Sequence, residues 1–131
     1  MSFPGTILLA DDEAHIRKYV GLILKQLGAQ QLLEASNGAE AVEIYAREKP
    51  DLVLLDVNMP LIDGLEALRQ IRALDPDAVV IMLTSVTTRQ AVETALEHGA
   101  ANFIRKDTPR DEISTALTET INAAFGDETL E

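Results

Sequence analysis

The chain has 131 residues, enough for one domain with its own hydrophobic core and too few for two ordinary domains. Hydrophobic residues make up 47% and charged residues 25%, as in globular proteins, and the absence of cysteine excludes disulfide scaffolds and thiol chemistry. With 11 Lys and Arg against 22 Asp and Glu, the net charge is −11, which argues against non-specific binding to nucleic acid or anionic membranes. Residues 1–10 resemble neither a signal peptide nor a membrane span, so we expect a cytoplasmic protein.

Five apolar runs alternate with amphipathic stretches along the chain. The first run, 6–10 (TILLA), predicts a buried strand. The next stretch repeats apolar residues at the spacing of one helix face and ends at Gly28, where a C-terminal cap belongs. The residues expected on this inner face are Ile16, Val20, Ile23, Leu24 and Leu27.

The middle of the chain repeats this alternation. A second strand is expected at 31–35 (QLLEA), followed by a helix that has Val42 and Tyr45 on its inner face and ends before Pro50. The run DLVLLD at 51–56 predicts a third strand that is apolar on both faces between two carboxylates. A turn at Asp63 and Gly64 then leads to a third helix whose first apolar residues are Leu65, Leu68 and Ile71.

The last third of the chain holds two further units. Strand 78–84 (AVVIMLT) leads to a helix that ends at Gly99. Strand 101–105 (ANFIR) leads to a helix with Thr108 as the expected N-cap and Pro109 as its first residue. The expected inner faces are Val92, Ala95 and Leu96 in the fourth helix, and Ile113, Leu117, Ile121 and Phe125 in the fifth.

The strand runs lack polar alternation, which indicates strands covered by helices on both faces of a parallel sheet. Right-handed crossovers then give an α/β fold, a doubly wound five-stranded (βα)5 three-layer sandwich. We expect one domain over residues 1–125 and an acidic tail at 126–131.

Polar side chains end four of the five strands: Asp11 and Asp12 after the first, Asp56 at the third, Thr84 and Ser85 at the fourth, and Lys106 after the fifth. Ligands of open parallel sheets bind beyond the carboxyl ends of the strands, and if the strand order is 2-1-3-4-5 these four ends meet at one rim. Asp51 begins its strand at the opposite end, so we expect it to have a structural role only.

Three carboxylates at one rim are unfavourable without a cation. Two such charges about 4 Å apart repel by about 4 kcal/mol at an effective dielectric of about 20, and Lys106 offsets only one charge. Oxygen ligands without cysteine or histidine favour Mg²⁺ over Zn²⁺ or copper. A carboxylate, Mg²⁺, a lysine and a hydroxyl around one point form a phosphoryl-transfer site whose nucleophile is the carboxylate.

The motifs at these strand ends are DDE at 11–13, DVNMP at 56–60, Asp63-Gly64, Thr84-Ser85, Gly99-Ala100 and Lys106. In this order they resemble the receiver domain of two-component response regulators, over about residues 6–125. The resemblance implies the strand order 2-1-3-4-5. It also implies that Asp56 accepts a phosphoryl group from a phosphohistidine on a histidine kinase or phosphotransfer protein.

The resemblance further implies a ligand set for Mg²⁺. Asp12 and Asp56 would bind the ion through their side chains, Asn58 through its backbone carbonyl, and Asp11 mostly through water. Lys106 would pair with the phosphoryl oxygens.

A switch is implied by the same resemblance. Thr84 would donate its hydroxyl to the phosphoryl group while Phe103 turns inward, and this movement would remodel the face of the fourth helix, fifth strand and fifth helix. A downstream protein, a homodimer partner or an output domain outside this chain would bind that face. A free-standing receiver and the first domain of a longer regulator are both compatible with the chain.

One position departs from the family pattern. The family usually has Pro after the lysine, joined by a cis bond, and here Asp107 follows Lys106. We expect a trans bond at Asp107, because a cis bond would cost about 3 kcal/mol there. Its carboxylate is also a candidate competitor for the ammonium of Lys106.

Alternative interpretations exist for the residues and for the function. Helix capping is the structural alternative for Asp11, Asp12, Thr84 and Ser85, and ordinary helix positions are expected for His15 and His98. A haloacid dehalogenase-type phosphatase has an acid/base Asp two residues after its nucleophile, whereas here Asn58 stands there. Neither Asn58 nor Val86 can act as a base, so we expect slow self-dephosphorylation. A phosphorylation-independent interaction module is favoured only by Asp107.

Overall fold

Strands and helices alternate along residues 5–126, the part of the chain that the computed structural model describes. The expected acidic tail lies, apart from Gly126, outside the described residues. In chain order the elements are β1 (Thr6–Ala10), α1 (Ala14–Gln26), β2 (Gln31–Ala35), α2 (Gly38–Glu48), β3 (Leu52–Leu55), α3 (Gly64–Leu74), β4 (Val80–Thr84), α4 (Arg89–Glu97), β5 (Asn102–Arg105) and α5 (Arg110–Phe125). No helix among them has the length and apolarity that a membrane crossing requires.

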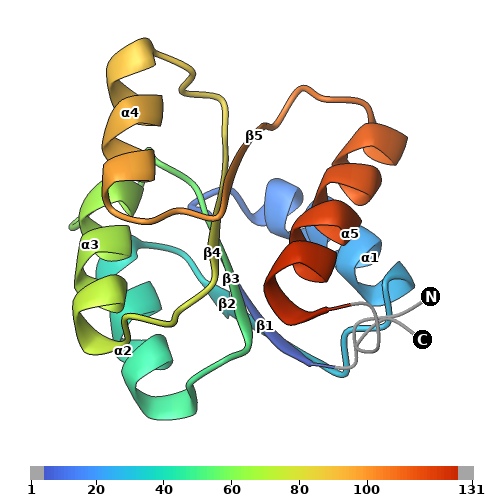
Figure 1. The fold of residues 1–131 in the computed structure, drawn as a ribbon, viewed down its shortest axis with the longest axis horizontal. Coiled ribbons are helices and arrows are strands. Elements are labelled where there is room, and N and C mark those ends of the chain that lie inside the picture. Colours follow the sequence, from blue (N-terminus) through green and yellow to red (C-terminus); the bar gives the residue numbers. More distant parts are fainter. Residues whose placement is uncertain (1–4, 127–131) are drawn as a thin grey trace.

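All strands pair in parallel in the order β2-β1-β3-β4-β5. Helices α1 and α5 cover one face of the sheet, and α2, α3 and α4 cover the other (Figure 1). The expected doubly wound three-layer sandwich is therefore confirmed. The central strands β1, β3 and β4 are buried almost throughout, which explains why their sequences show no polar alternation.

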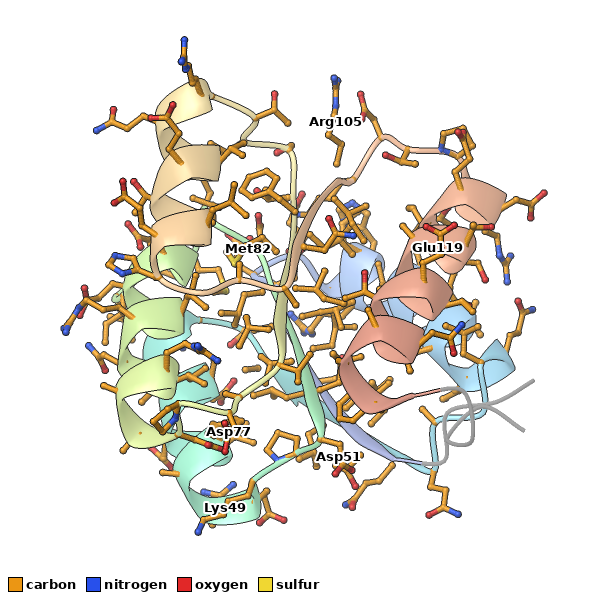
Figure 2. All side chains as sticks on the ribbon, in the orientation of Figure 1. Lys49, Asp51, Asp77, Met82, Arg105 and Glu119 are labelled. Atoms are coloured by element: carbon orange, nitrogen blue, oxygen red, sulfur yellow. The ribbon has the colours of Figure 1, made fainter. Side chains whose placement is uncertain are left out.

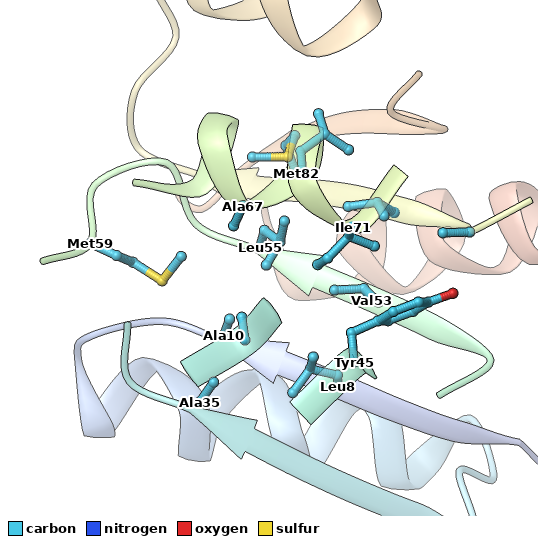
Figure 3. Packing of buried hydrophobic residues seen from close by; sticks show 14 of the residues in the cluster. Leu8, Ala10, Ala35, Tyr45, Val53, Leu55, Met59, Ala67, Ile71 and Met82 are labelled. Carbon is cyan, nitrogen blue, oxygen red and sulfur yellow. The ribbon is translucent and has the colours of Figure 1, made fainter. Parts of the chain in front are cut away.

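The sheet divides the hydrophobic core into two clusters, because successive strand residues point to opposite faces. The α2–α4 cluster joins one face of the sheet to α2, α3 and α4 (Figure 3), and its strand residues include Leu8, Val53, Leu55 and Met82. The α1/α5 cluster lies on the other face and includes Ile7, Leu9, Leu54, Ile81 and Leu83 with Val20, Ile23, Leu24, Ile113, Leu117 and Ile121 from the helices.

The glycines expected to end α1 and α4 do so. Gly28 and Gly99 have φ angles of 94° and 87°, in the left-handed region that glycine adopts without strain. Asp51 has the structural role expected of it, since its carboxylate accepts a hydrogen bond from the backbone N–H of Thr6 at 2.8 Å. In Figure 2, Asp51 lies toward the same end of the sheet as Lys49 and Asp77, opposite Arg105.

Two expectations about the helices were wrong. Leu96 is 58% exposed, because α4 packs through the small residues Ala91 and Ala95 and turns Leu96 away from the core. Thr108 does not cap α5: Pro109 is the N-cap, and among the described residues no side chain caps this helix. Thr108 belongs instead to the preceding turn, in which its N–H donates to the carbonyl of Arg105 at 3.2 Å, and it therefore lies one residue before the N-cap.

Candidate functional site

The carboxyl ends of β1 and β3 bring acidic side chains together. Ala10 pairs with Leu55 in the sheet, so the residues that follow them, Asp11 and Asp56, are neighbours beyond the strand ends. The backbone N–H of Asp56 donates to the carbonyl of Ala10 at 3.0 Å and extends this pairing. Asp11, Asp12 and Asp56 each offer one carboxylate oxygen within 4.8 Å of the other two. This acidic group is the one the sequence predicted.

Lys106 reaches the acidic group from the loop after β5. Its ammonium lies 2.6 Å from Oδ2 of Asp11 and 2.9 Å from Oδ2 of Asp56, two carboxylates that are only 2% and 3% exposed as residues. Burial, together with the nearby charge of Asp56, raises the pKa of Asp11, although hydrogen bonds from Lys106 and the Glu13 N–H act in the opposite direction. Burial lowers the pKa of Lys106, but the two carboxylates outweigh it, so this pKa is raised and the lysine stays charged.

One oxygen of Asp56 stands out within this cluster. Its Oδ1 atom is buried and has no hydrogen-bond partner among the described residues. A buried, unpaired carboxylate oxygen is costly in a native protein and calls for a ligand. Oxygen-only donors with the exposed Asp12 beside them suit a hard cation such as Mg²⁺, which keeps part of its water shell.

Thr84 lies at the end of β4, fully buried beside the acidic group. Its Oγ1 accepts hydrogen bonds from the N–H of Val86 at 3.1 Å and of Val57, the residue after Asp56, at 3.4 Å. The capping alternative for Thr84 and Ser85 is wrong, because Thr88 caps α4 by accepting from the N–H of Ala91. Nor do Asp11 and Asp12 cap α1, whose N-cap is Glu13.

The remaining predicted residues lie around this centre. Phe103 pairs with Met82 across the sheet and packs, half-buried, against the α2–α4 cluster. Asn58 is exposed in the loop between β3 and α3, and a role for its carbonyl stays a prediction. Neither His15 nor His98 belongs to the acidic group.

Asp107 does not compete for Lys106. Its carboxylate accepts hydrogen bonds from Nε and Nη2 of Arg105 at 3.1 and 2.8 Å. The chain has no cis peptide bond among the described residues, so the bond between Lys106 and Asp107 is trans, as expected. The position that departs from the family pattern thus leaves the ammonium with Asp11 and Asp56.

Two glycines hold the loop that follows Asp56. A Cβ atom on Gly64 would lie 1.8 Å from the carbonyl oxygen of Asp56, and one on Gly38 would lie 1.9 Å from that of Ile62. The N–H of Gly64 also donates to the carbonyl of Val57 at 2.8 Å. Such close backbone approaches require glycine, which gives the Asp63-Gly64 motif a physical reason.

Sequence reasoning missed two residues beside the site. Glu13 places a carboxylate oxygen 3.5 Å from the Lys106 ammonium, and Arg17 donates from Nη1 to the carbonyl of Asp11 at 2.7 Å. Glu13 stands in the DDE motif, so its position was visible. Arg17 is four residues after Glu13, so the helical repeat places both on the same side of α1. This spacing is the only feature of the sequence that could have indicated Arg17.

A model of the response regulator receiver domain matches residues 7–118. The chain belongs to this family. The receiver domain is 39% identical over 116 residues to the chemotaxis protein CheY of Bacillus subtilis (strain 168), an alignment that covers 88% of this chain and 97% of that protein. It is 45% identical over 102 residues to a protein-glutamate methylesterase/protein-glutamine glutaminase of Archaeoglobus fulgidus, covering 76% of this chain and 29% of that protein.

A solved structure shares the fold of this receiver domain. It is the CheX–CheY–BeF3–Mg²⁺ complex from Borrelia burgdorferi, in which the matched chain is 30% identical, with a TM-score of 0.84 and coverage of 94% of this chain and 90% of that chain. The chain is therefore a CheY-like receiver domain of two-component signalling.

Proposed function

We propose that Asp56 is the phosphoacceptor of this receiver domain and takes its phosphoryl group from a histidine kinase or phosphotransfer protein. The observation that carries the proposal is the buried Oδ1 of Asp56, which has no partner among the described residues and shares its carboxylate with the Lys106 ammonium. A nucleophilic oxygen without a hydrogen-bond donor keeps its lone pairs available for phosphorus.

The proposed reaction moves the phosphoryl group from an imidazole of the donor protein to the carboxylate of Asp56. An oxygen of Asp56 forms a bond to phosphorus as the phosphorus–nitrogen bond to the donor imidazole breaks, and the leaving imidazole keeps that electron pair and takes up a proton from solvent water. The product is an aspartyl phosphate. The ammonium of Lys106, held 2.9 Å from Asp56, pairs with the phosphoryl oxygens and balances part of the added charge.

Asp11, Asp12 and Asp56, with the backbone carbonyl of Asn58, would hold Mg²⁺ at this rim. The bound ion would neutralise carboxylate charge and orient the phosphoryl oxygens. The convergence of three carboxylate oxygens within 4.8 Å supports this ligand set. The CheY complex of Borrelia burgdorferi contains Mg²⁺ and BeF3, which also favours an Mg²⁺-dependent site in the present receiver domain.

Phosphorylation is read out through Thr84 and Phe103. Thr84 donates its hydroxyl to the phosphoryl group, so its contacts with the N–H groups of Val57 and Val86 are the ones that change. Phe103 then packs more deeply against the α2–α4 cluster. The face formed by α4, β5 and α5 changes shape and binds a downstream protein, a second copy of the chain or an output domain.

The chemistry proposed here is a single turnover on the domain's own side chain. Neither Asn58 nor Val86 can activate water as a base, so the aspartyl phosphate persists long enough to act as a signal. The interaction-module alternative gains no support, because Asp107 pairs with Arg105 and leaves Lys106 at the site.

The test is the intact mass of the protein after incubation with Mg²⁺ and acetyl phosphate. We expect one added phosphoryl group on the wild type and on Asp51→Asn, a matched control at the other end of the same strand run, and none on Asp56→Asn. An unmodified wild type, or an Asp56→Asn protein that still gains the phosphoryl mass, would show that the assignment is wrong.

A further inference from the structure

The side chain of Arg17 connects three parts of the fold next to the candidate metal ligands. From α1, its Nη1 donates to the carbonyl oxygen of Asp11 at 2.7 Å, and its Nε pairs with the carboxylate of Glu34 on β2 at 3.0 Å. The Arg17 side chain is 19% exposed, whereas that of Glu34 is 53% exposed. The guanidinium is thus held by the more exposed Glu34 on one side, while on the other side it donates to the backbone of the loop between β1 and α1.

The loop between β1 and α1 has other hydrogen bonds, but among residues 5–126 none of them holds the carbonyl of Asp11. Asp11 donates its N–H to Ala35 at 3.0 Å, and its Oδ1 accepts from the N–H of Glu13 at 2.9 Å. The carbonyl of Asp11 belongs to the peptide group that precedes Asp12. Because a peptide group is planar, fixing that carbonyl also fixes the direction in which the chain enters Asp12.

We propose that Arg17 is a positioning residue for Mg²⁺ binding: it sets the peptide between Asp11 and Asp12 so that their carboxylates face Asp56. The inference rests on the proposed function, since it concerns the same metal site. Arg17 contacts a backbone carbonyl and Glu34 and acts on the ion only through the loop. The planar fork of arginine makes both contacts at once, which a lysine ammonium cannot reproduce.

The sign of the effect separates positioning from simple electrostatics. Arg17 is a cation close to the acidic group, so its charge alone repels Mg²⁺. If charge were all that mattered, Arg17→Met would bind Mg²⁺ more tightly than the wild type. Positioning predicts weaker binding, and it predicts weaker binding in Arg17→Lys as well, where the charge is retained.

A second readout uses the different demands of two ions. Mg²⁺ requires near-ideal octahedral geometry, whereas Ca²⁺ accepts irregular coordination. A loss of loop geometry should therefore weaken Mg²⁺ binding more than Ca²⁺ binding. A change of net charge or of overall stability acts on both divalent ions alike.

The experiment is calorimetric titration of Mg²⁺ and of Ca²⁺ into wild type, Arg17→Met, Arg17→Lys and the matched control Arg47→Met. Arg47 is an arginine of α2 that pairs with Glu43 and Glu48. We expect Mg²⁺ affinity to fall about tenfold in both Arg17 variants, with a smaller fall for Ca²⁺, and to stay at the wild-type value in Arg47→Met. Should Arg17→Met fail to fold in urea-unfolding controls, Arg17→Lys decides.

Three results would overturn the inference: Mg²⁺ affinity in Arg17→Met equal to or above that of the wild type, full wild-type affinity in Arg17→Lys, or equal losses for both ions. A wild type that binds Mg²⁺ and becomes phosphorylated while the Arg17 variants bind normally refutes the role of Arg17 alone. A wild type that binds no Mg²⁺ refutes the proposed function and this inference together.

Discussion

Replacing Lys106 with methionine should destabilise the metal-free domain and at the same time tighten its binding of Mg²⁺. The ammonium of Lys106 lies 2.6 Å from Asp11 and 2.9 Å from Asp56, among the oxygens that we propose bind the cation. At an effective dielectric of about 20, each attraction is about 6 kcal/mol before desolvation is counted. Removing one partner of such a buried cluster costs about 3 kcal/mol net, because the remaining carboxylates are left uncompensated.

The same free energy should reappear in metal binding. The affinity for Mg²⁺ reflects the free-energy difference between the metal-bound and the metal-free protein. The ion pairs of Lys106 stabilise the metal-free protein, so Lys106→Met raises the free energy of that state only. A cost of about 3 kcal/mol there corresponds to Mg²⁺ binding about 100-fold tighter. The extent of phosphorylation by acetyl phosphate should nevertheless fall, because no ammonium remains to pair with the phosphoryl oxygens.

Calorimetric titration with Mg²⁺ measures the affinity, and urea unfolding with and without Mg²⁺ measures the stability. Lys25→Met, which removes an exposed lysine of α1, is the matched control and should change neither quantity. Equal or weaker Mg²⁺ binding in Lys106→Met would refute the reasoning, because it would mean that the lysine and the cation do not compete for the same oxygens.

Three further predictions concern the acidic group and the loops around it. The raised pKa of Asp11 means that the folded, metal-free protein binds this proton more tightly than the unfolded chain does. The free energy of unfolding of the wild type relative to Asp11→Asn should therefore increase as the pH falls through that raised pKa and level off below the ordinary aspartate value; a difference independent of pH would contradict the shift. Gly64→Ala should lose about 2 kcal/mol or more in urea unfolding, because its Cβ would lie 1.8 Å from the carbonyl oxygen of Asp56. Gly21→Ala is its control, since a Cβ there meets only the flexible end of Leu32 at 3.1 Å, and similar losses in both would exclude the backbone clash as the cause. Val86→Glu should accelerate loss of phosphoryl from the phosphorylated protein in a time course of intact mass, by supplying a base near the site; an unchanged decay would mean that the side chain does not reach it.

Most of the fold was predictable because its three central strands are buried on both faces. The runs at 6–10 and 31–35 correspond to β1 and β2 residue for residue, and the flanking Asp51 and Asp56 of the third run lie just outside β3. Apolar runs carry no record of which strand lies beside which, so the order β2-β1-β3-β4-β5 came from the family resemblance. Leu96 was misplaced because helical periodicity cannot tell which of two adjacent stripes packs inward when the inner residues are small.

The acidic group was predictable and its hydrogen bonds were not. The carboxyl ends of parallel strands meet at one edge, so polar residues at strand ends could be assigned to a common site from the sequence. Whether Lys106 pairs with one carboxylate or two, and whether Asp107 turns to Lys106 or Arg105, depends on loop geometry that no periodicity records. Arg17 escaped notice because its partner is a backbone carbonyl, which has no sequence signature.

The sheet acts as a partition between two separately packed halves of the molecule. A change of side-chain volume on one side is absorbed by neighbours on that side, so destabilising substitutions from opposite sides should sum, while those within one side should not. Phe103 packs with the α2–α4 cluster, and Val20 with the α1/α5 cluster. Substitutions in the α2–α4 cluster, with which Phe103 packs, can therefore accumulate during evolution without compensating substitutions in the α1/α5 cluster.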